Sequence, residues 1–401
     1  MKLAFIGGRD IYSVGGIENW MLHLSERLAK MGHEVIVYCE STRDSVRFHG
    51  DVKVVYVKAP RSPYFCKIVA SYRATRAALK AGCQLIHYNV WPSAVWAYKA
   101  EKKGVPTLLM GHGFEWKRSK YNRLEQWLLR KMEERAARRH KHIVLCSQEQ
   151  TDWYVNHYDA AGKVQTIPSA VNLPAALTPE PAAPVPDSAL VPDSAHNAAP
   201  AITLAPARTL LYMGRISPEK NVDLLIRAFE NIQLAFEQAS SHTEARLLIA
   251  GNLDLKTRYG RKIKAMMAAN PHVEYVGEVS GEKKEALLRR ADVFCLPSSI
   301  EGLSIALLEA AAYRIPIIAS DLRSNHEALG SNAFWVAPGD IHSLEACLHR
   351  SLATSEEQLT QYVEKAYERV AQHYTWDKVA AQYEHYIKNL LDANRPAEPQ
   401  S

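Results

Sequence analysis

The sequence predicts an α/β protein with two domains, each built on a doubly wound parallel sheet, that face each other across a cleft. Strand-like and helix-like segments alternate along most of the 401 residues, a pattern typical of such domains. The strand-like runs are rich in Val, Ile and Leu and lack polar alternation, which indicates strands buried on both faces. Ligands of open parallel sheets bind at the carboxyl ends of the strands, so we expect the site in the cleft.

Each half of the chain supplies its own series of elements. In the first half, strand-like runs lie at residues 3–6, 34–39, 52–57, 85–88, 107–110, 143–146 and 164–167. Helical periodicity marks residues 17–31, 64–80, 93–103 and 124–139 between them. The second half has strand-like runs at residues 209–213, 246–250, 273–276, 293–296, 316–319 and 334–336. A last helical pattern, at residues 379–391, precedes a polar tail at 394–401.

Residues 174–206 separate the two halves. They contain eight prolines in 33 residues and a tandem repeat of Val-Pro-Asp-Ser-Ala. Proline has no backbone N–H for a sheet or a helix, so this composition favours a flexible, partly extended linker. The expected domains are therefore residues 1–173 and 207–375, followed by a C-terminal helix and tail at residues 376–401.

The composition excludes several classes of protein. With 47% hydrophobic and 23% charged residues, the chain is not globally disordered. No apolar run approaches the roughly 18 residues that span a bilayer, and the first apolar run is too short for the core of a signal peptide. The six cysteines include no Cys-x-x-Cys pair, so neither a zinc ribbon nor a disulfide scaffold is indicated. We expect a reducing, cytoplasmic location.

Positive charge is concentrated in one segment. Residues 117–142 contain ten Lys or Arg against three Glu, whereas the whole chain has a net charge of +6. Such a segment favours an anionic surface or ligand. The alternative is a solvated helix face, with Trp127, Leu128 and Met132 in the core. A role in nucleic-acid binding is a further alternative, although the sequence contains no recognised nucleic-acid module.

Glycines and single charged residues follow several of the strand-like runs. Gly15 and Gly16 open a helix after the first run, where backbone N–H groups can approach a ligand. His112 stands between two glycines after the run at 107–110, so its imidazole is expected on a loop at a strand end. Arg215 and Lys220 flank a strand–helix junction and suit a diphosphate. The structural alternatives are turn glycines, a structural histidine and an exposed basic loop.

The most informative stretch follows the run at 293–296. Glu301 stands just before a predicted helix that begins near Leu303. The amides of Gly302, Leu303 and Ser304 are therefore expected to form an anion site at its start. Glu309 lies inside the apolar part of that helix, where an unpaired carboxylate would be costly to bury. We therefore expect Glu309 to bind hydroxyl groups or a cation.

Several motifs are missing from the sequence. No Asp-x-Asp pair of the kind that holds Mg²⁺ or Mn²⁺ on a diphosphate occurs. There is also no Walker A, Gly-x-Ser-x-Gly or His-Glu-x-x-His motif. The charge on a leaving diphosphate would then be met by Arg215, Lys220 and helix ends rather than by a metal.

The motifs together resemble a known family. Glu301 and Glu309 form an E-x7-E pair, and combined with Gly-Arg…Pro-Glu-Lys at residues 214–220 this pair is similar to that of the retaining glycosyltransferases of family 4, which have the GT-B fold. Arg9 with Gly-Gly-Ile-Glu at 15–18, Gly-His-Glu-Val at 32–35 and His-Gly-Phe-Glu-Trp-Lys-Arg-Ser-Lys at 112–120 resemble the subgroup that builds bacterial exopolysaccharides, capsules and O-antigens. Several members of that subgroup are rhamnosyltransferases.

The resemblance implies a metal-independent transferase without a cofactor, peripheral on the inner face of the cytoplasmic membrane. It implies an acceptor-binding first domain, a nucleotide-sugar-binding second domain and a C-terminal helix that crosses back to the first. The long linker departs from the family and is interpreted as a tolerated insertion. The implied partners are a nucleotide-sugar donor, a lipid-linked or polysaccharide acceptor and an anionic membrane, with no nucleic acid.

The resemblance also implies roles for individual residues. The catalytic residues would be His112 and Glu301. The donor diphosphate would be bound by Gly15, Gly16, Arg215, Lys220, Leu303 and Ser304, the ribose by Glu309, and the base by Gly277 and Val279. The membrane or acceptor patch would consist of Lys117, Arg118, Lys120, Arg135, Arg138 and Arg139. The alternatives are a GT-B-fold sugar-nucleotide epimerase or other non-transferase, and a nucleic-acid-binding protein that uses residues 117–142.

Overall fold

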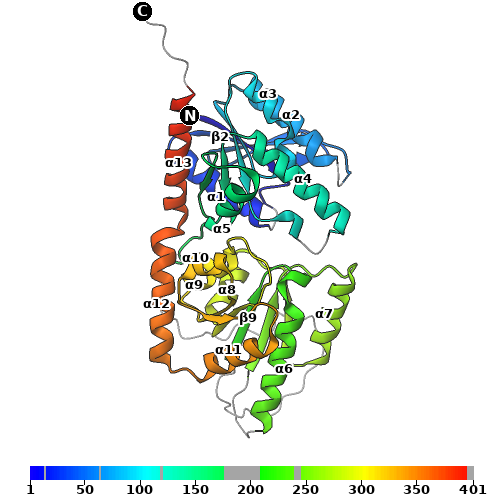
Figure 1. Cartoon of the computed structure of the whole chain (residues 1–401), viewed down its shortest axis with the longest axis vertical. Coiled ribbons are helices and arrows are strands. Elements are labelled where there is room, and N and C mark those ends of the chain that lie inside the picture. The colour runs from blue at the N-terminus through cyan, green and yellow to red at the C-terminus, as the bar shows by residue number, and fades with distance from the viewer. Residues whose placement is uncertain (13–14, 63–64, 118–120, 176–207, 239–244, 395–401) are drawn as a thin grey trace, which may run out of the picture.

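The computed structural model describes residues 1–12, 15–62, 65–117, 121–175, 208–238 and 245–394 (Figure 1). Apart from their first residues, the expected linker and the polar tail lie outside the described residues, as do Arg118 and Lys120 of the expected basic patch. The elements form an N-terminal unit around one sheet and a C-terminal unit around another.

The N-terminal sheet has eight strands in the order β3-β4-β2-β1-β5-β6-β7-β8. All neighbours are parallel except β3, which is antiparallel to β4. The strands are β1 (Lys2–Gly8), β2 (Glu34–Ser41), β3 (Ser45–His49), β4 (Val52–Lys58), β5 (Leu85–Tyr88), β6 (Thr107–Gly111), β7 (Ile143–Leu145) and β8 (Val164–Thr166). The chain adds strands on one side of β1 and then on the other, so the strand order reverses between β1 and β5.

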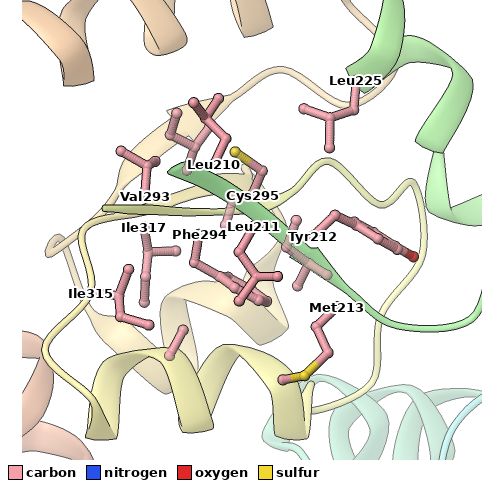
Figure 2. Packing of buried hydrophobic residues seen from close by; sticks show 14 of the residues in the cluster. Leu210, Leu211, Tyr212, Met213, Leu225, Val293, Phe294, Cys295, Ile315 and Ile317 are labelled. Atoms are coloured by element: carbon pink, nitrogen blue, oxygen red, sulfur yellow. The ribbon is translucent and has the colours of Figure 1, made fainter. Parts of the chain in front are cut away.

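The C-terminal sheet has six parallel strands in the order β11-β10-β9-β12-β13-β14. They are β9 (Arg208–Met213), β10 (Ala245–Ala250), β11 (Val273–Gly277), β12 (Val293–Leu296), β13 (Ile317–Ser320) and β14 (Phe334–Val336). Figure 2 shows Leu211 of β9 and Phe294 of β12 within the packed core. The strand order of this sheet reverses between β9 and β12. Ligands of such sheets bind at this reversal, beyond the carboxyl ends of the strands.

Helices cover both sheets. In the N-terminal unit they are α1 (Gly16–Lys30), α2 (Cys66–Lys80), the 3₁₀ turn η1 (Trp91–Trp96), α3 (Ala97–Glu101), the 3₁₀ turn η2 (Glu115–Lys117), α4 (Arg123–Arg139) and α5 (Gln148–Tyr158). In the C-terminal unit they are the 3₁₀ turn η4 (Pro218–Lys220), α6 (Val222–Gln238), α7 (Arg258–Ala269), α8 (Gly281–Arg290), α9 (Ile305–Ala312), α10 (Arg323–Leu329), α11 (Ile341–Ala353) and α12 (Glu356–His373).

The last helix, α13 (Trp376–Ala393), returns to the N-terminal unit. Its buried Trp376 and Tyr383 join the hydrophobic cluster on one face of the N-terminal sheet, and the Tyr383 ring packs edge-on against Trp20 of α1. The backbone N–H of Val171 donates to the carbonyl of Tyr374 at 2.8 Å. This bond holds the end of the N-terminal unit beside the segment that leads into α13. Figure 1 shows α12 and α13 following one another along the same side of both units.

This architecture confirms the predicted fold class, two α/β units with parallel sheets. Among the described residues, no helix is both long and apolar enough to cross a membrane. The loops at the carboxyl ends of the two sheets meet: a β-carbon placed on Gly302 would lie 3.4 Å from the carbonyl oxygen of His112. Similarly, one placed on Gly16 would lie 3.9 Å from Ile305. The contact positions residues from both units around one site.

Candidate active site

The loop after β9 and the loop after β12 are joined by hydrogen bonds at the reversal of the C-terminal sheet. Asn221 adopts a left-handed conformation with φ of 52°, and its amide donates to the carbonyl of Pro297 at 2.9 Å and to Ser299 Oγ at 2.7 Å. The backbone N–H of Ser299 in turn donates to the carbonyl of Glu219 at 2.8 Å. These bonds hold the two predicted ligand-binding loops in one rigid arrangement.

Within this arrangement Lys220 and Glu301 form an ion pair. Lys220 Nζ donates to Glu301 Oε1 at 2.5 Å, and the two side chains are only 13% and 7% exposed. The residue predicted to bind the diphosphate, Lys220, and the residue predicted to contact the sugar, Glu301, are therefore adjacent, although they lie 81 residues apart in sequence. A charge-assisted bond at this burial fixes the orientation of both groups.

Arg215 lies on the same loop as Lys220 and is exposed. The hydroxyl of the buried Tyr212 donates to the carbonyl of Arg215 at 2.7 Å, which holds the backbone at the strand end. Among the described residues, the Arg215 guanidinium has neither an ion pair nor a hydrogen bond. The guanidinium therefore places a positive charge that no described side chain pairs with on the same loop as Lys220.

Glu309 is paired with a cation that the sequence analysis did not single out. Lys284 Nζ of α8 donates to Glu309 Oε1 at 2.6 Å, with side chains 28% and 14% exposed. This pairing agrees with the expectation that a carboxylate in the apolar helix α9 would bind a cation or hydroxyl groups. The pKa of His23 in α1 is lowered mainly by burial, and the nearby positive charge of Lys284 lowers it further. The pair therefore borders the N-terminal unit.

The start of α9 corrects one expectation. The helix begins at Ile305, not near Leu303, because Ser304 is its N-cap and its Oγ accepts a bond from the backbone N–H of Leu307 at 3.4 Å. Serine is a strong N-cap, since its hydroxyl satisfies an orphan donor of the first turn. The amides of Leu303 and Ser304 consequently precede the first helical turn instead of forming it.

The expected base-binding residues lie at the end of β11. Gly277 has a φ of 78°, and its carbonyl accepts from the backbone N–H of Gly251 at 2.7 Å. A β-carbon placed on Gly277 would meet no atom within 4 Å, so the backbone there borders open space. Val279 packs partly on the core of the C-terminal unit. The two residues lie at the same edge of the sheet as the Lys220–Glu301 pair, two strands away from β9.

His112 lies directly after β6, in the N-terminal unit. Gly113 has a φ of 143°, a conformation that side chains rarely adopt, so glycine is required on this side of the histidine. The imidazole packs edge-on against Trp20 at 5.4 Å between ring centroids, and Nδ1 lies 4.0 Å from Cys146 Sγ. These neighbours hold the ring in place, and the main-chain carbonyl of His112 lies next to the loop that carries Gly302.

Gly15 and Gly16 form the start of α1, as expected, with Gly15 as its N-cap. A β-carbon on Gly15 would lie 2.4 Å from Glu18 Oε2, and Glu18 Oε1 accepts from the backbone N–H of Arg9 at 3.4 Å. Glycine at position 15 thus makes room for the Glu18 carboxylate, which folds back over the start of the helix. Its negative charge is favourable at the positive end of the helix dipole.

The basic segment forms η2 and α4. Glu133, which the sequence analysis did not single out, is 1% exposed on the inner side of α4 and accepts from Trp116 Nε1 at 3.2 Å and from the hydroxyl of Tyr158 at 3.3 Å. Burial raises the pKa of Glu133 to about 7. On the outer side, Trp127 and Leu128 are 58% and 52% exposed. The alternative that these two residues belong to the core is therefore wrong.

The expected cations of this segment differ in their surroundings. The ammonium group of Lys117 lies 4.1 Å from the centroid of the Phe114 ring. Arg135, Arg138 and Arg139 are exposed on α4, and Arg138 is paired with Glu134 at 2.9 Å. Among the residues that the structure describes, no group of three or more His, Cys, Asp or Glu side chains is placed to hold a metal ion.

Both halves of the chain match models of glycosyltransferase domains. Residues 14–174 match the model described as Glycosyltransferase Family 4, and residues 203–369 match the model described as Glycosyl transferases group 1. Phosphatidyl-myo-inositol mannosyltransferase of Mycobacterium leprae is 30% identical over 182 residues, which are 44% of this chain and 45% of that protein. Lipopolysaccharide 1,2-N-acetylglucosaminetransferase of Salmonella typhimurium is 28% identical over 193 residues, 46% of this chain and 49% of that protein.

The chain spans about half the length of the curated relatives it matches. Sucrose-phosphate synthase from Thermosynechococcus elongatus superposes with a TM-score of 0.81 at 20% identity, covering 98% of this chain and 100% of that one. At this identity the likeness shows the fold alone. The chain thus carries a glycosyltransferase family 4 domain followed by a glycosyl transferases group 1 domain, arranged in the GT-B fold.

Proposed function

We propose that the protein is a retaining, metal-independent hexosyltransferase that moves one sugar from a nucleotide-sugar donor to a lipid-linked or polysaccharide acceptor of a bacterial surface glycan. The observation that carries the proposal is the pairing of Lys220 with Glu301 on two loops that meet at the reversal of the C-terminal sheet. The finer subgroup, which builds exopolysaccharides, capsules and O-antigens and includes rhamnosyltransferases, is proposed from the motifs of the N-terminal half.

The donor is proposed to lie along the carboxyl edge of the C-terminal sheet. Arg215 and Lys220 supply positive charge to the diphosphate, assisted by the amides of Leu303 and Ser304. Glu309 accepts hydrogen bonds from the ribose hydroxyls, and Lys284 holds its carboxylate in place. The open space beside Gly277 receives the base, with Val279 as an apolar neighbour.

The transferred sugar is proposed to lie between the two units. Glu301 contacts it from the C-terminal unit, and His112 contacts it from the N-terminal unit, whose main chain lies against Gly302. Gly15 and Gly16 face the diphosphate from the other side, where Gly16 lies near Ile305. Metal independence is proposed because the sequence contains no Asp-x-Asp pair and because Arg215 and Lys220 can stabilise the leaving diphosphate.

The acceptor is proposed to be held at an anionic membrane, on its cytoplasmic face, by the outer side of α4. Leu124, Leu128, Lys131 and Arg135 follow one another at helical spacing and are exposed, so they share one face. Each cation near an anionic leaflet contributes about 1 kcal/mol, and exposed Leu124, at 72%, and Trp127 can enter the interface. The mannosyltransferase relative, by its name, acts on phosphatidyl-myo-inositol, which favours this proposal over a GT-B-fold enzyme that is not a transferase.

A panel of nucleotide sugars tests the proposed reaction. We expect the purified protein to release nucleoside diphosphate from one of them, and the same diphosphate to raise its Tm, as any ligand of the folded state does. Vesicle flotation tests the membrane role. Binding should need anionic lipid, decrease near about 0.5 M salt and weaken in the variant Arg135→Glu/Arg138→Glu/Arg139→Glu. If no nucleotide sugar is turned over and no nucleoside diphosphate raises the Tm, the protein is not a transferase of this kind.

A further inference from the structure

A groove separates the C-terminal half of α4 from η1 and α3, away from the proposed donor site. Its volume is about 270 Å³, below the roughly 300–1,000 Å³ of pockets that enclose drug-sized ligands. Figure 1 shows α4 and α3 on the side of the N-terminal unit away from α13. The groove thus lies beside the proposed membrane face and is large enough for only part of a molecule.

One part of the groove is apolar and open to solvent. Trp91, Met132 and Ala136 line it, together with Val95 and Tyr98, which are 44% and 39% exposed. Side chains of this kind cover a hydrocarbon chain without needing any polar partner, and each methylene that they remove from water adds to the affinity. The apolar walls therefore suit a segment of a single acyl chain.

The other part of the groove carries uncommitted polar groups. Arg135 and Arg139 are one turn apart on α4, and in the described part of the chain neither guanidinium forms an ion pair or a hydrogen bond. His140 is only 7% exposed, and its Nδ1 has no hydrogen-bond partner, with Glu101 Oε1 at 4.0 Å. The Glu101 carboxylate itself accepts from Thr107 Oγ1 at 2.6 Å. A buried imidazole nitrogen without a partner is unfavourable, because it has lost its hydrogen bonds to water, and a ligand oxygen in the groove would offset that loss.

We propose that this groove binds one anionic membrane phospholipid, with an acyl chain along Val95 and Met132 and its phosphate between Arg135 and Arg139. The phosphate charge matches the two guanidinium groups, and a phosphate or glycerol oxygen lies within reach of His140. The inference deepens the proposed membrane role and rests on it: the face of α4 would bind the bilayer surface, while the groove would select a single lipid molecule.

Monomeric dihexanoylphosphatidylglycerol, titrated into the full chain and followed by calorimetry, tests the groove. We expect one lipid per protein, with affinity at least tenfold weaker in Arg135→Glu, Arg139→Glu and Val95→Glu. Arg123→Glu is the matched control, because it makes the same charge change on the same helix at an exposed residue outside both the groove and the proposed membrane face. It should change the affinity less than twofold. Thermal unfolding checks that each variant remains folded.

Three results would overturn the proposal: an equal loss of affinity in Arg123→Glu, unchanged affinity in Val95→Glu, or equally tight binding of glycerol 3-phosphate, which lacks the chains. Tighter binding of a short isoprenyl phosphate would overturn the assignment to a phospholipid. Flotation separates this inference from the proposed function. Selective binding of the monomeric lipid without vesicle binding supports the groove and refutes the membrane role. Vesicle binding with no difference between Arg135→Glu and Arg123→Glu refutes the groove.

Discussion

The ion pair between Lys220 and Glu301 allows the stability of the C-terminal unit to be separated from its chemistry. Its two side chains are 13% and 7% exposed. Changing Lys220 to Met keeps the aliphatic stem and leaves the Glu301 carboxylate buried without its cation. Removing one partner of a fully buried pair costs roughly 3–5 kcal/mol. Because Lys220 keeps some contact with solvent, we expect the free energy of unfolding to fall by about 2–3 kcal/mol.

Glu301→Gln removes the other charge, and the double variant Lys220→Met/Glu301→Gln leaves neither charge unpaired. We therefore expect the double variant to recover most of the lost stability, with a coupling of about 2 kcal/mol between the sites. Urea unfolding of the four proteins measures this coupling from the midpoints at a constant slope. Sugar transfer should stay abolished in the double variant, because the donor needs both charged groups. Additive stability losses, or transfer regained in the double variant, would refute the reasoning.

Three further predictions concern single groups. Glu309→Gln should weaken nucleoside diphosphate binding about 10- to 150-fold, which corresponds to losing a charge-assisted bond of roughly 1.5–3 kcal/mol; wild-type affinity in calorimetry would exclude the ribose role. EDTA should leave the rate of transfer unchanged, whereas a strict need for added Mn²⁺ or Mg²⁺ would reveal a metal mechanism. Burial raises the pKa of Glu133 from 4.5 to about 7. Between these two pH values the folded state retains a proton that the unfolded state releases. The contribution of protonated Glu133 to the free energy of unfolding is therefore fully present below pH 4.5 and is lost as the pH rises through 7. Glu133→Gln should flatten the fall in Tm between about pH 5 and 8, and curves that stay parallel would contradict the shift.

The strands were largely predictable because parallel strands buried on both faces need continuous apolar runs, as at β9 and β12. The strand β3 was missed, since it is an exposed edge strand of the sequence Ser-Val-Arg-Phe-His whose pattern carries no such signal. The single helix expected at residues 93–103 forms η1 and α3 instead. The ends of helices differ from the expected ones where a capping residue sets them, as Ser304 sets the start of α9.

The site was predictable to the extent that its residues follow strand ends. Lys220 and Glu301 could be placed on loops, but their contact depends on which strands are neighbours in the sheet. Lys284 was missed because nothing in its local sequence distinguishes it from other surface lysines of α8; only the packing of α8 near α9 brings it to Glu309. Glu133 likewise looks like one charge in a basic helix, and its burial follows from Trp116 and Tyr158, which come from other elements.

Hydrogen exchange measured with and without the nucleotide sugar that the panel identifies tests the central claim most directly. Backbone amides exchange more slowly where a bound ligand stabilises the structure around them. If the donor lies on the loops that follow β9 and β12, peptides covering residues 214–221 and 297–309 should gain the largest protection, with a smaller gain around His112. Protection confined to α4, or none in either loop at saturating ligand, would contradict a donor site at the reversal of the C-terminal sheet.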